Sequence, residues 1–185
     1  MTQIADRLTL QQFLALPEEE PALEYDCGEV TQKVSPKGRH SALQLDTASF
    51  IDRRIRRRKH GRAFTELRAS FANMSRVPDI AVYRWDRIPV DVDGNIVDDF
   101  FEPPDVAVEI ISPGQSVNRL IRRCLTFLRA GVKATDLIDP PDRSIVVMRR
   151  DERAVILREG EELDLSDVIP ELRLDVKAVF AALKR

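Results

Sequence analysis

Hydrophobic positions recur along the chain with two spacings, and each spacing predicts one type of element. Leu43, Thr47, Ile51 and Ile55 lie four residues apart, which predicts a helix over about residues 40–59 with one buried stripe. Three arginines of the same segment point away from that stripe: Arg53, Arg56 and Arg57. The segment therefore reads as an amphipathic helix that packs on a core.

Three further helices are predicted from periodicity and end signals. Residues 8–16, "LTLQQFLAL", form a short helix with Thr9 as a plausible N-cap. Residues 116–129 form a second helix, which Gly131 ends, and a C-terminal helix begins at about Asp175.

Short runs of β-branched and aromatic residues between turn residues predict the strands. A hairpin, "ALEYDCGEVTQKV", turns near Cys27 and Gly28. Strands are expected at "AFTELRASF", "PDIAVYRW", "PPDVAVEIISP", "ATDLID", "SIVVMRR" and "AVILRE". Residues 86–103 form a long polar loop between two of them. Because strands and helices are mixed in this order, we expect an α/β fold with a mixed central sheet flanked by helices. We assign residues 1–185 to a single domain.

The strand "PPDVAVEIISP" contains a carboxylate, Glu109, within an apolar run. Such a run between prolines is typical of a strand that is covered on both faces. An ionised side chain there costs several kcal/mol unless a partner compensates it. Glu109 therefore needs a partner.

Asp79 is one candidate for a shared site with Glu109. It opens the strand "PDIAVYR", and both carboxylates follow a proline in strands of similar character. If the strands are neighbours, the two carboxylates converge, and a Mg²⁺ ion between them would remove their repulsion. The alternative is that Asp79 only caps a strand edge and Glu109 pairs with an internal arginine. The spacing alone does not decide between the two.

Composition limits the partners without naming one. The 185 residues are 43% hydrophobic and 32% charged, which fits one globular domain. The net charge of -2 provides no overall positive field, so any nucleic-acid site must be local. Cys27 and Cys124 form no metal spacing, and no apolar segment has membrane length. We expect a cytoplasmic protein that makes no membrane contact.

Five segments, taken in order, resemble the bacterial Uma-two family of restriction-endonuclease-like proteins, within the PD-(D/E)xK nuclease superfamily. They are "LTLQQFLALPEEEPALEYDCGEV", "SPKGRHSAL", "VPDIAVYR", "PPDVAVEIISP" and "FLRAGVKATDLIDP". The resemblance covers nearly the whole chain. It implies a restriction-endonuclease-like core, DNA as the substrate, Mg²⁺ or Mn²⁺ as the cofactor, and a homodimer that pairs two sites.

The resemblance also implies the site residues. The family's early Glu, the Asp of Pro-Asp and the strand Glu fall on Glu24, Asp79 and Glu109, with Asp79 and Glu109 as metal ligands and Glu24 as an auxiliary ligand or base. The superfamily lysine two residues after the strand carboxylate is Ile111 here. In the family this lysine commonly moves to the following helix, where the aligned residue is Arg123.

Helical geometry tests the placement of Arg123. A buried face is predicted at Val117, Leu120, Ile121, Cys124 and Leu128. Arg123 then lies on its flank, within reach of the site, while Arg119 and Arg122 point to solvent. Arg123 could also only extend along the core edge.

The lysine-to-arginine change leaves three interpretations open. Arginine supplies charge to a transition state, but it does not readily give up a proton. The sequence is compatible with a nuclease, a slow nuclease or a metal-binding relic. The competing class is an inactive scaffold that binds nucleic acid or regulates. We interpret His40 as a helix-start residue at the site entrance, with a structural role favoured.

Overall fold

The computed structural model describes residues 8–151 and 153–184. The main helices are α2 (Gly38–Ile55) and α3 (Val117–Arg129), and the shorter ones are α1 (Leu10–Leu14) and α4 (Val176–Ala181). The strands are β1 (Leu23–Asp26), β2 (Glu29–Gln32), β3 (Gly61–Thr65), β4 (Ala69–Phe71), β5 (Met74–Arg76), β6 (Ile80–Arg84), β7 (Val106–Ile110), β8 (Ala134–Asp139), β9 (Ser144–Arg149), β10 (Ala154–Leu157), β11 (Glu162–Asp164) and β12 (Arg173–Asp175). The predicted domain limits, 1–185, stay a prediction, because residues 1–7, 152 and 185 lie outside the described part.

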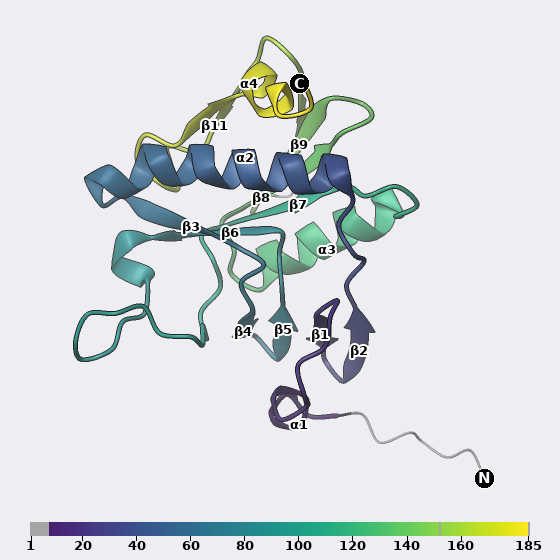
Figure 1. Ribbon diagram of the computed structural model, residues 1–185, viewed down its shortest axis with the longest axis vertical. Helices are drawn as coiled ribbons and strands as arrows, with labels where there is room; N and C mark the ends of the chain where they lie inside the picture. Colours follow the sequence, from purple (N-terminus) through teal and green to yellow (C-terminus); the bar gives the residue numbers. More distant parts are fainter. Residues whose placement is uncertain (1–7, 152, 185) are drawn as a thin grey trace.

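A six-stranded sheet in the order β10-β9-β8-β7-β6-β3 forms the centre of the molecule. Only β7 and β8 run parallel, and every other pair is antiparallel. Figure 1 shows α2 on one face of this sheet and α3 on the other, with α4 beyond α2. The expected α/β fold with a mixed central sheet flanked by helices is confirmed.

Apolar side chains fill both spaces between helix and sheet. The stripe predicted for α2 is buried, with Leu43 and Ile55 fully enclosed against the sheet. On α3, Leu120, Cys124 and Leu128 are buried as expected. Val117, the first residue of the helix, was expected to be buried and is 43% exposed, and Ile121 is only partly buried.

A second, four-stranded sheet in the order β2-β1-β5-β4 lies below the central one in Figure 1. The predicted hairpin is confirmed: Cys27 and Gly28 both adopt positive φ, as a two-residue turn requires. Strand β5 was not predicted. It pairs with β1 and carries the chain directly into β6, so this small sheet brings Glu24 to the edge of the central sheet.

Several boundaries differ from the sequence expectation. The segment 63–71 is two strands in different sheets, because Glu66 has a φ of 52° and bends the chain between them. Helix α2 ends at Ile55 and continues as a short 3-10 turn, which Lys59 closes with a positive φ. The β11–β12 pair was not predicted, since its three-residue strands are mostly charged. Thr9 caps α1 as predicted, in a reciprocal capping box with Gln12.

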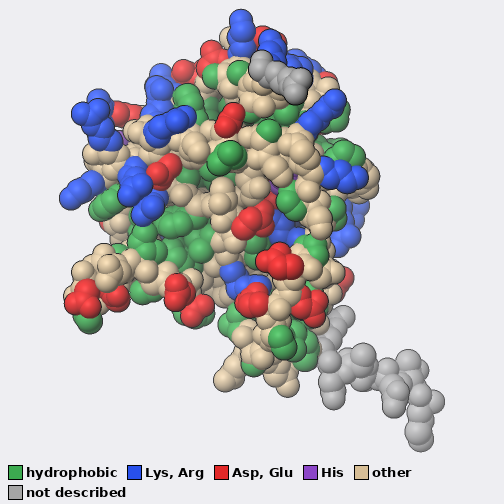
Figure 2. All heavy atoms as spheres, in the orientation of Figure 1, with side chains coloured by type: hydrophobic (Ala, Val, Ile, Leu, Met, Phe, Trp, Pro, Cys, Tyr) green, Lys and Arg blue, Asp and Glu red, His purple; other side chains and the backbone are tan. Residues whose placement is uncertain are grey.

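Charged residues cover the C-terminal end of α2 and the turn that follows it. Figure 2 shows Lys and Arg side chains gathered there, where five arginines are exposed: Arg53, Arg54, Arg56, Arg57 and Arg58. Within the described part of the chain, every helix is too short or too polar to cross a bilayer. Both cysteines are free, Cys27 exposed and Cys124 buried.

One buried carboxylate of the sheet makes a stability prediction. Asp136 lies on β8 between Val108 and Val147, and neither of its oxygens has a hydrogen-bond partner among the described residues. Burial raises the pKa of Asp136 to about 7, although Arg149 acts in the opposite direction. The folded state therefore holds a proton that the unfolded state has already released, and stability falls as pH rises from about 3.8 to about 7.

We expect Asp136→Asn to remove this loss. The free energy of unfolding of the variant, minus that of wild type, should grow across that pH window to a few kcal/mol, at about 1.4 kcal/mol per pKa unit. Above the window the difference should stay constant. Urea unfolding between pH 4.5 and 8 measures it, with Asp93→Asn in the exposed loop as control. A difference that does not depend on pH would contradict the prediction.

Candidate active site

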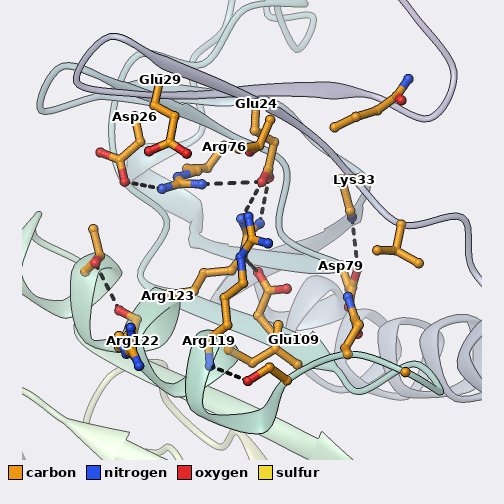
Figure 3. Close-up of a pocket in the computed structure, with 18 of the residues that line it drawn as sticks. Glu24, Asp26, Glu29, Lys33, Arg76, Asp79, Glu109, Arg119, Arg122 and Arg123 are labelled. Carbon is orange, nitrogen blue, oxygen red and sulfur yellow. Dashed lines mark hydrogen bonds and ion pairs between the residues drawn. The ribbon is translucent and has the colours of Figure 1, made fainter.

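A pocket of about 810 Å³ opens between α3, the β1–β2 hairpin and the first turn of α2. All four residues predicted from the sequence line it: Glu24, Asp79, Glu109 and Arg123. They come from β1, the start of β6, β7 and α3, and Figure 3 shows them converging on the same space. The tertiary structure thus assembles the predicted set from segments as far as 99 residues apart.

Asp79 directly precedes β6, and Glu109 lies in the neighbouring strand β7. Ile80 pairs with Val108 across β6 and β7, so Asp79 stands beside Glu109 at the same end of the pair. Both side chains are buried, at 3% and 4% exposure. Oδ2 of Asp79 accepts a hydrogen bond of 2.7 Å from the backbone N–H of Ile110, which fixes the carboxylate against β7.

Arg123 provides the partner that Glu109 requires. Its Nε donates to Oε1 of Glu109 at 2.7 Å. Its two terminal nitrogens donate to the two oxygens of Glu24, with Nη2 at 2.7 Å. The guanidinium also lies 5.1 Å from the ring centre of Phe127. Arg123 is therefore a fixed bridge between two carboxylates, held by charge-assisted hydrogen bonds.

The pKa values of these acids follow from burial and from the cations beside them. Burial alone would raise the pKa of Glu24, but Arg123 and the N–H of Val77 hold it below its usual value. Burial also opposes ionisation of Asp79, yet His40 and Lys33 lower its pKa to about 2.

Glu109 behaves differently. Burial raises the pKa of Glu109 to about 7, and the attraction of Arg123 does not overcome burial and the repulsion of Asp79. Of these three acids, Glu109 is thus the one that burial makes hardest to ionise.

The contacts also match the alternative that the sequence left open. Glu109 does pair with an internal arginine, and Asp79 does accept a backbone N–H at the strand edge. These contacts are compatible with a metal site as well, because Asp79 and Glu109 still face one pocket. Their role as metal ligands stays a prediction.

Sequence reasoning missed Lys33. Its ammonium Nζ lies 2.9 Å from Oδ1 of Asp79 and 2.7 Å from Oε2 of Glu66, and its side chain is only 12% exposed. Figure 3 shows it entering the pocket from the side opposite to Arg123. Ile111, at the superfamily's lysine position, is buried in the core beneath α3. The pocket therefore contains a lysine amine, but it comes from the residue that follows β2 rather than from the strand of Glu109.

Alternation along the hairpin could have identified Lys33. Glu24 pairs with Thr31, and the N–H of Lys33 continues the ladder to the carbonyl of Ala22. Since side chains two residues apart in a strand share a face, Thr31 and Lys33 lie on the same face as Glu24. The hairpin was predicted, but this consequence was not drawn from it.

His40 and the arginines complete the pocket lining. His40 lies in the first turn of α2, as expected, but it is 6% exposed and faces Asp79, with its Nε2 3.5 Å from Oδ1. Arg119 and Arg122 are exposed on α3, as predicted, and line the pocket from its outer side. Arg76 pairs with Asp26 and lies 3.5 Å from Glu24. Acidic and basic side chains thus both line the pocket, with exposed arginines on the side of α3.

Comparison with known proteins identifies the family. Residues 10–177 match the Uma2 family, described as "Putative restriction endonuclease". The chain belongs to the Uma2 family. A solved Uma2-like structure is described as a "putative nuclease belonging to DUF820" from Anabaena variabilis ATCC 29413. It is 37% identical, has a TM-score of 0.90, and the match covers 95% of this chain and 99% of that one.

The restriction-endonuclease-like fold inferred from the sequence is therefore confirmed. No curated protein matches this Uma2 chain. The activity has to be argued from the pocket, because a fold hosts functions through its sites.

The network predicts that Arg123 supports stability. Arg123→Ala leaves Glu24 and Glu109 buried without their main counterion, which costs about 3 to 5 kcal/mol when one partner of a buried pair is lost. Urea unfolding at pH 7.5 measures the cost. Arg122→Ala, one position along the same helix and exposed, should change stability by about 0.5 kcal/mol or less. Equal effects of the two substitutions would show that the Arg123 bridge contributes nothing.

Proposed function

We propose that this member of the Uma2 family is a Mg²⁺-dependent endonuclease that hydrolyses phosphodiester bonds of DNA. The observation that carries the proposal is the pair of buried carboxylates, Asp79 and Glu109, at adjacent strands in one pocket. The family description and the fold support nuclease chemistry. The two adjacent carboxylates suit a metal ion, and the exposed Arg119 and Arg122 suit the phosphates on either side of a scissile bond.

The charges of the pocket fit a divalent cation. The two adjacent buried carboxylates, Asp79 and Glu109, have the cations Lys33 and Arg123 on either side, and Arg76 also pairs with Glu24. Burial raises the pKa of Glu109, and repulsion from Asp79 and Glu24 adds to the rise, so a cation bound beside Glu109 would favour its ionised form. Carboxylate oxygens are the ligands that Mg²⁺ and Mn²⁺ prefer, so Asp79 and Glu109 are suitable ligands for either ion.

The chain's own residues have separable roles in this proposal. A bound divalent cation would polarise the phosphate and lower the pKa of the attacking water. Arg123 supplies a permanent positive charge in the pocket, where negative charge develops in the transition state. Arg119 and Arg122 bind the flanking phosphates from the outer side of the pocket. The amine of Lys33 provides the donor that Ile111 cannot.

Glu24 fits a supporting role better than that of a general base. Its pKa is lowered and both of its oxygens are bound to Arg123, so it is a weak proton acceptor. We propose that Glu24 orients Arg123 and serves as an auxiliary ligand when the site is loaded.

A scaffold without activity is the second candidate, and one observation favours it. Arg123 replaces the family lysine, and its guanidinium already makes four hydrogen bonds, to Glu24, Glu109 and the carbonyl of Val77. Such a protein would bind nucleic acid through the exposed arginines of α3 without cutting it. Metal binding at Asp79 and Glu109 separates the two candidates, because the scaffold has no need of it.

We expect purified protein to cleave DNA only when Mg²⁺ or Mn²⁺ is present. Asp79→Asn should abolish cleavage, because it removes a charged ligand and retains the shape. Arg123→Lys should keep or raise activity, since it restores an amine at the family position. Arg123→Ala should lower kcat by about 100-fold or more, which is the effect of losing one preorganised transition-state donor. Gel assays on plasmid and oligonucleotide DNA measure the rates.

Asp93→Asn in the exposed loop serves as the matched control and should cleave like wild type. If neither wild type nor Arg123→Lys cuts any DNA with either metal, the endonuclease proposal is wrong and the scaffold stands.

We further propose a cytoplasmic homodimer, since restriction-endonuclease-like folds cut both strands of DNA by pairing two sites, and symmetric dimers are the commonest oligomers. The edge strand β10 supports this, because Val155 and Ile156 are 54% and 55% exposed there and the strand has a free edge. Sedimentation at micromolar concentration should give twice the 21.1 kDa chain mass, and Ile156→Lys should shift the protein to monomer. A wild type of 21.1 kDa at that concentration contradicts the dimer.

A further inference from the structure

The imidazole of His40 is buried with one nitrogen unsatisfied. Its side chain is 7% exposed, and Nδ1 lies 3.0 Å from the hydroxyl of Ser112. Nε2 has no hydrogen-bond partner among the described residues, although it lies 3.5 Å from Oδ1 of Asp79. Buried polar atoms are normally hydrogen-bonded, and 3.5 Å is a long contact, so Asp79 engages Nε2 only weakly.

Three potential ligand atoms surround one point beside this nitrogen. His40, Glu66 and Asp79 each offer one atom, and the three atoms all lie within 4.8 Å of one another. They come from α2, from the residue after β3 and from the residue before β6. One nitrogen and two carboxylate oxygens at this spacing can share a single cation.

Each of the three side chains is held from behind. Ser112 contacts the far nitrogen of His40, and Ile110 donates its N–H to Oδ2 of Asp79. Gln44 donates to Oε1 of Glu66 at 2.6 Å, which leaves Oε2 directed into the cluster. Supporting contacts of this kind orient the ligands of protein metal sites.

A positive charge already lies in the cluster. The ammonium of Lys33 bridges Oε2 of Glu66 and Oδ1 of Asp79, at 2.7 and 2.9 Å. It compensates two carboxylates, but Nε2 of His40 receives no hydrogen bond from it, whereas a divalent metal at the same place could bind this nitrogen together with both carboxylates. Lys33 thus stands where a metal ion would bind.

We propose that His40, Glu66 and Asp79 form a second cation site, which takes a divalent metal that accepts imidazole, such as Mn²⁺, Co²⁺ or Zn²⁺, in exchange for the ammonium of Lys33. Mg²⁺ is a poor occupant, because it prefers oxygen ligands. The site shares Asp79 with the proposed nuclease site, but it uses neither Glu109 nor Arg123. It requires no nuclease activity, so the two proposals can fail separately.

The experiment is a titration of the tag-free, metal-stripped protein with Mn²⁺ alone, followed by EPR. The EPR signal of unbound Mn²⁺ gives the affinity of the protein for the ion. Electron spin echo modulation from ¹⁴N reports an imidazole that is bound to the ion. The variants are His40→Gln, Glu66→Gln, Lys33→Met and Glu109→Gln. His60→Gln is the matched control, since it removes the other histidine of the chain.

We expect ¹⁴N modulation in wild type, in His60→Gln and in Glu109→Gln. His40→Gln should lose the modulation and weaken one Mn²⁺ site by tenfold or more, with little change in Mg²⁺ competition. Lys33→Met should strengthen binding at this site several-fold, because no ammonium has to leave. Glu66→Gln should weaken it, and because Glu66 is 44% exposed this variant is expected to fold even if His40→Gln does not.

Absence of ¹⁴N modulation in both wild type and Lys33→Met would overturn the inference. So would modulation that survives His40→Gln. Either result leaves the proposed nuclease function standing if Mg²⁺-dependent cleavage is still observed. Conversely, ¹⁴N modulation in a protein that cuts no DNA supports the second cation site and contradicts the proposed nuclease function.

Discussion

The bridge that Arg123 forms between Glu109 and Glu24 is the interaction on which the pocket depends. It joins three separate parts of the fold: α3, the central sheet through β7 and the small sheet through β1. In a buried site each of these charges would be costly alone, and their mutual attraction compensates only when the hydrogen bonds are well formed. The same contacts that fix Arg123 therefore fix the position of the small sheet against the central one.

Buried carboxylates of the central sheet show what such compensation requires. Asp105 is fully buried, and Arg87 and Lys133 lie 2.8 and 3.0 Å from its Oδ1. Asp136 has no hydrogen bond among the described residues, and burial raises its pKa. Glu109 lies between these cases, since it has a strong partner but also a second carboxylate beside it. Glu109 alone among these three acids lines the large pocket, so only its charge can be matched by a ligand.

The pocket is divided between two cations of different character. Arg123 is a planar fork that is held at several points, while Lys33 is a single ammonium between two carboxylates. An ammonium on a flexible stem is the easier of the two to displace, because fewer directional contacts are lost. The cation on the side of α3 is thus held rigidly, whereas the cation on the side of the hairpin can be displaced. This division is consistent with a site that is charge-compensated when empty and that accepts a divalent ion.

Much of the fold follows from local patterns. The stripe of α2, the strand that holds Glu109 and the hairpin at Cys27 and Gly28 were all predicted correctly, because spacing and turn residues act over short distances. Strand β5 was missed, since Ala72 and Asn73 form its turn with positive φ, which alanine rarely adopts. The bend at Glu66, which separates β3 from β4, has the same origin. Such conformations are imposed by tertiary contacts rather than by the residues that adopt them.

The sequence by itself determined that a carboxylate lies inside an apolar strand, that it needs a partner, and which residues match the family's site. It could not decide what surrounds them. Only the tertiary structure placed Lys33 and His40 beside Asp79. It also showed that Arg123 pairs with both Glu24 and Glu109. The physical reason is that hydrophobic spacing is a property of neighbouring residues, whereas charge compensation depends on the three-dimensional meeting of side chains that lie many residues apart.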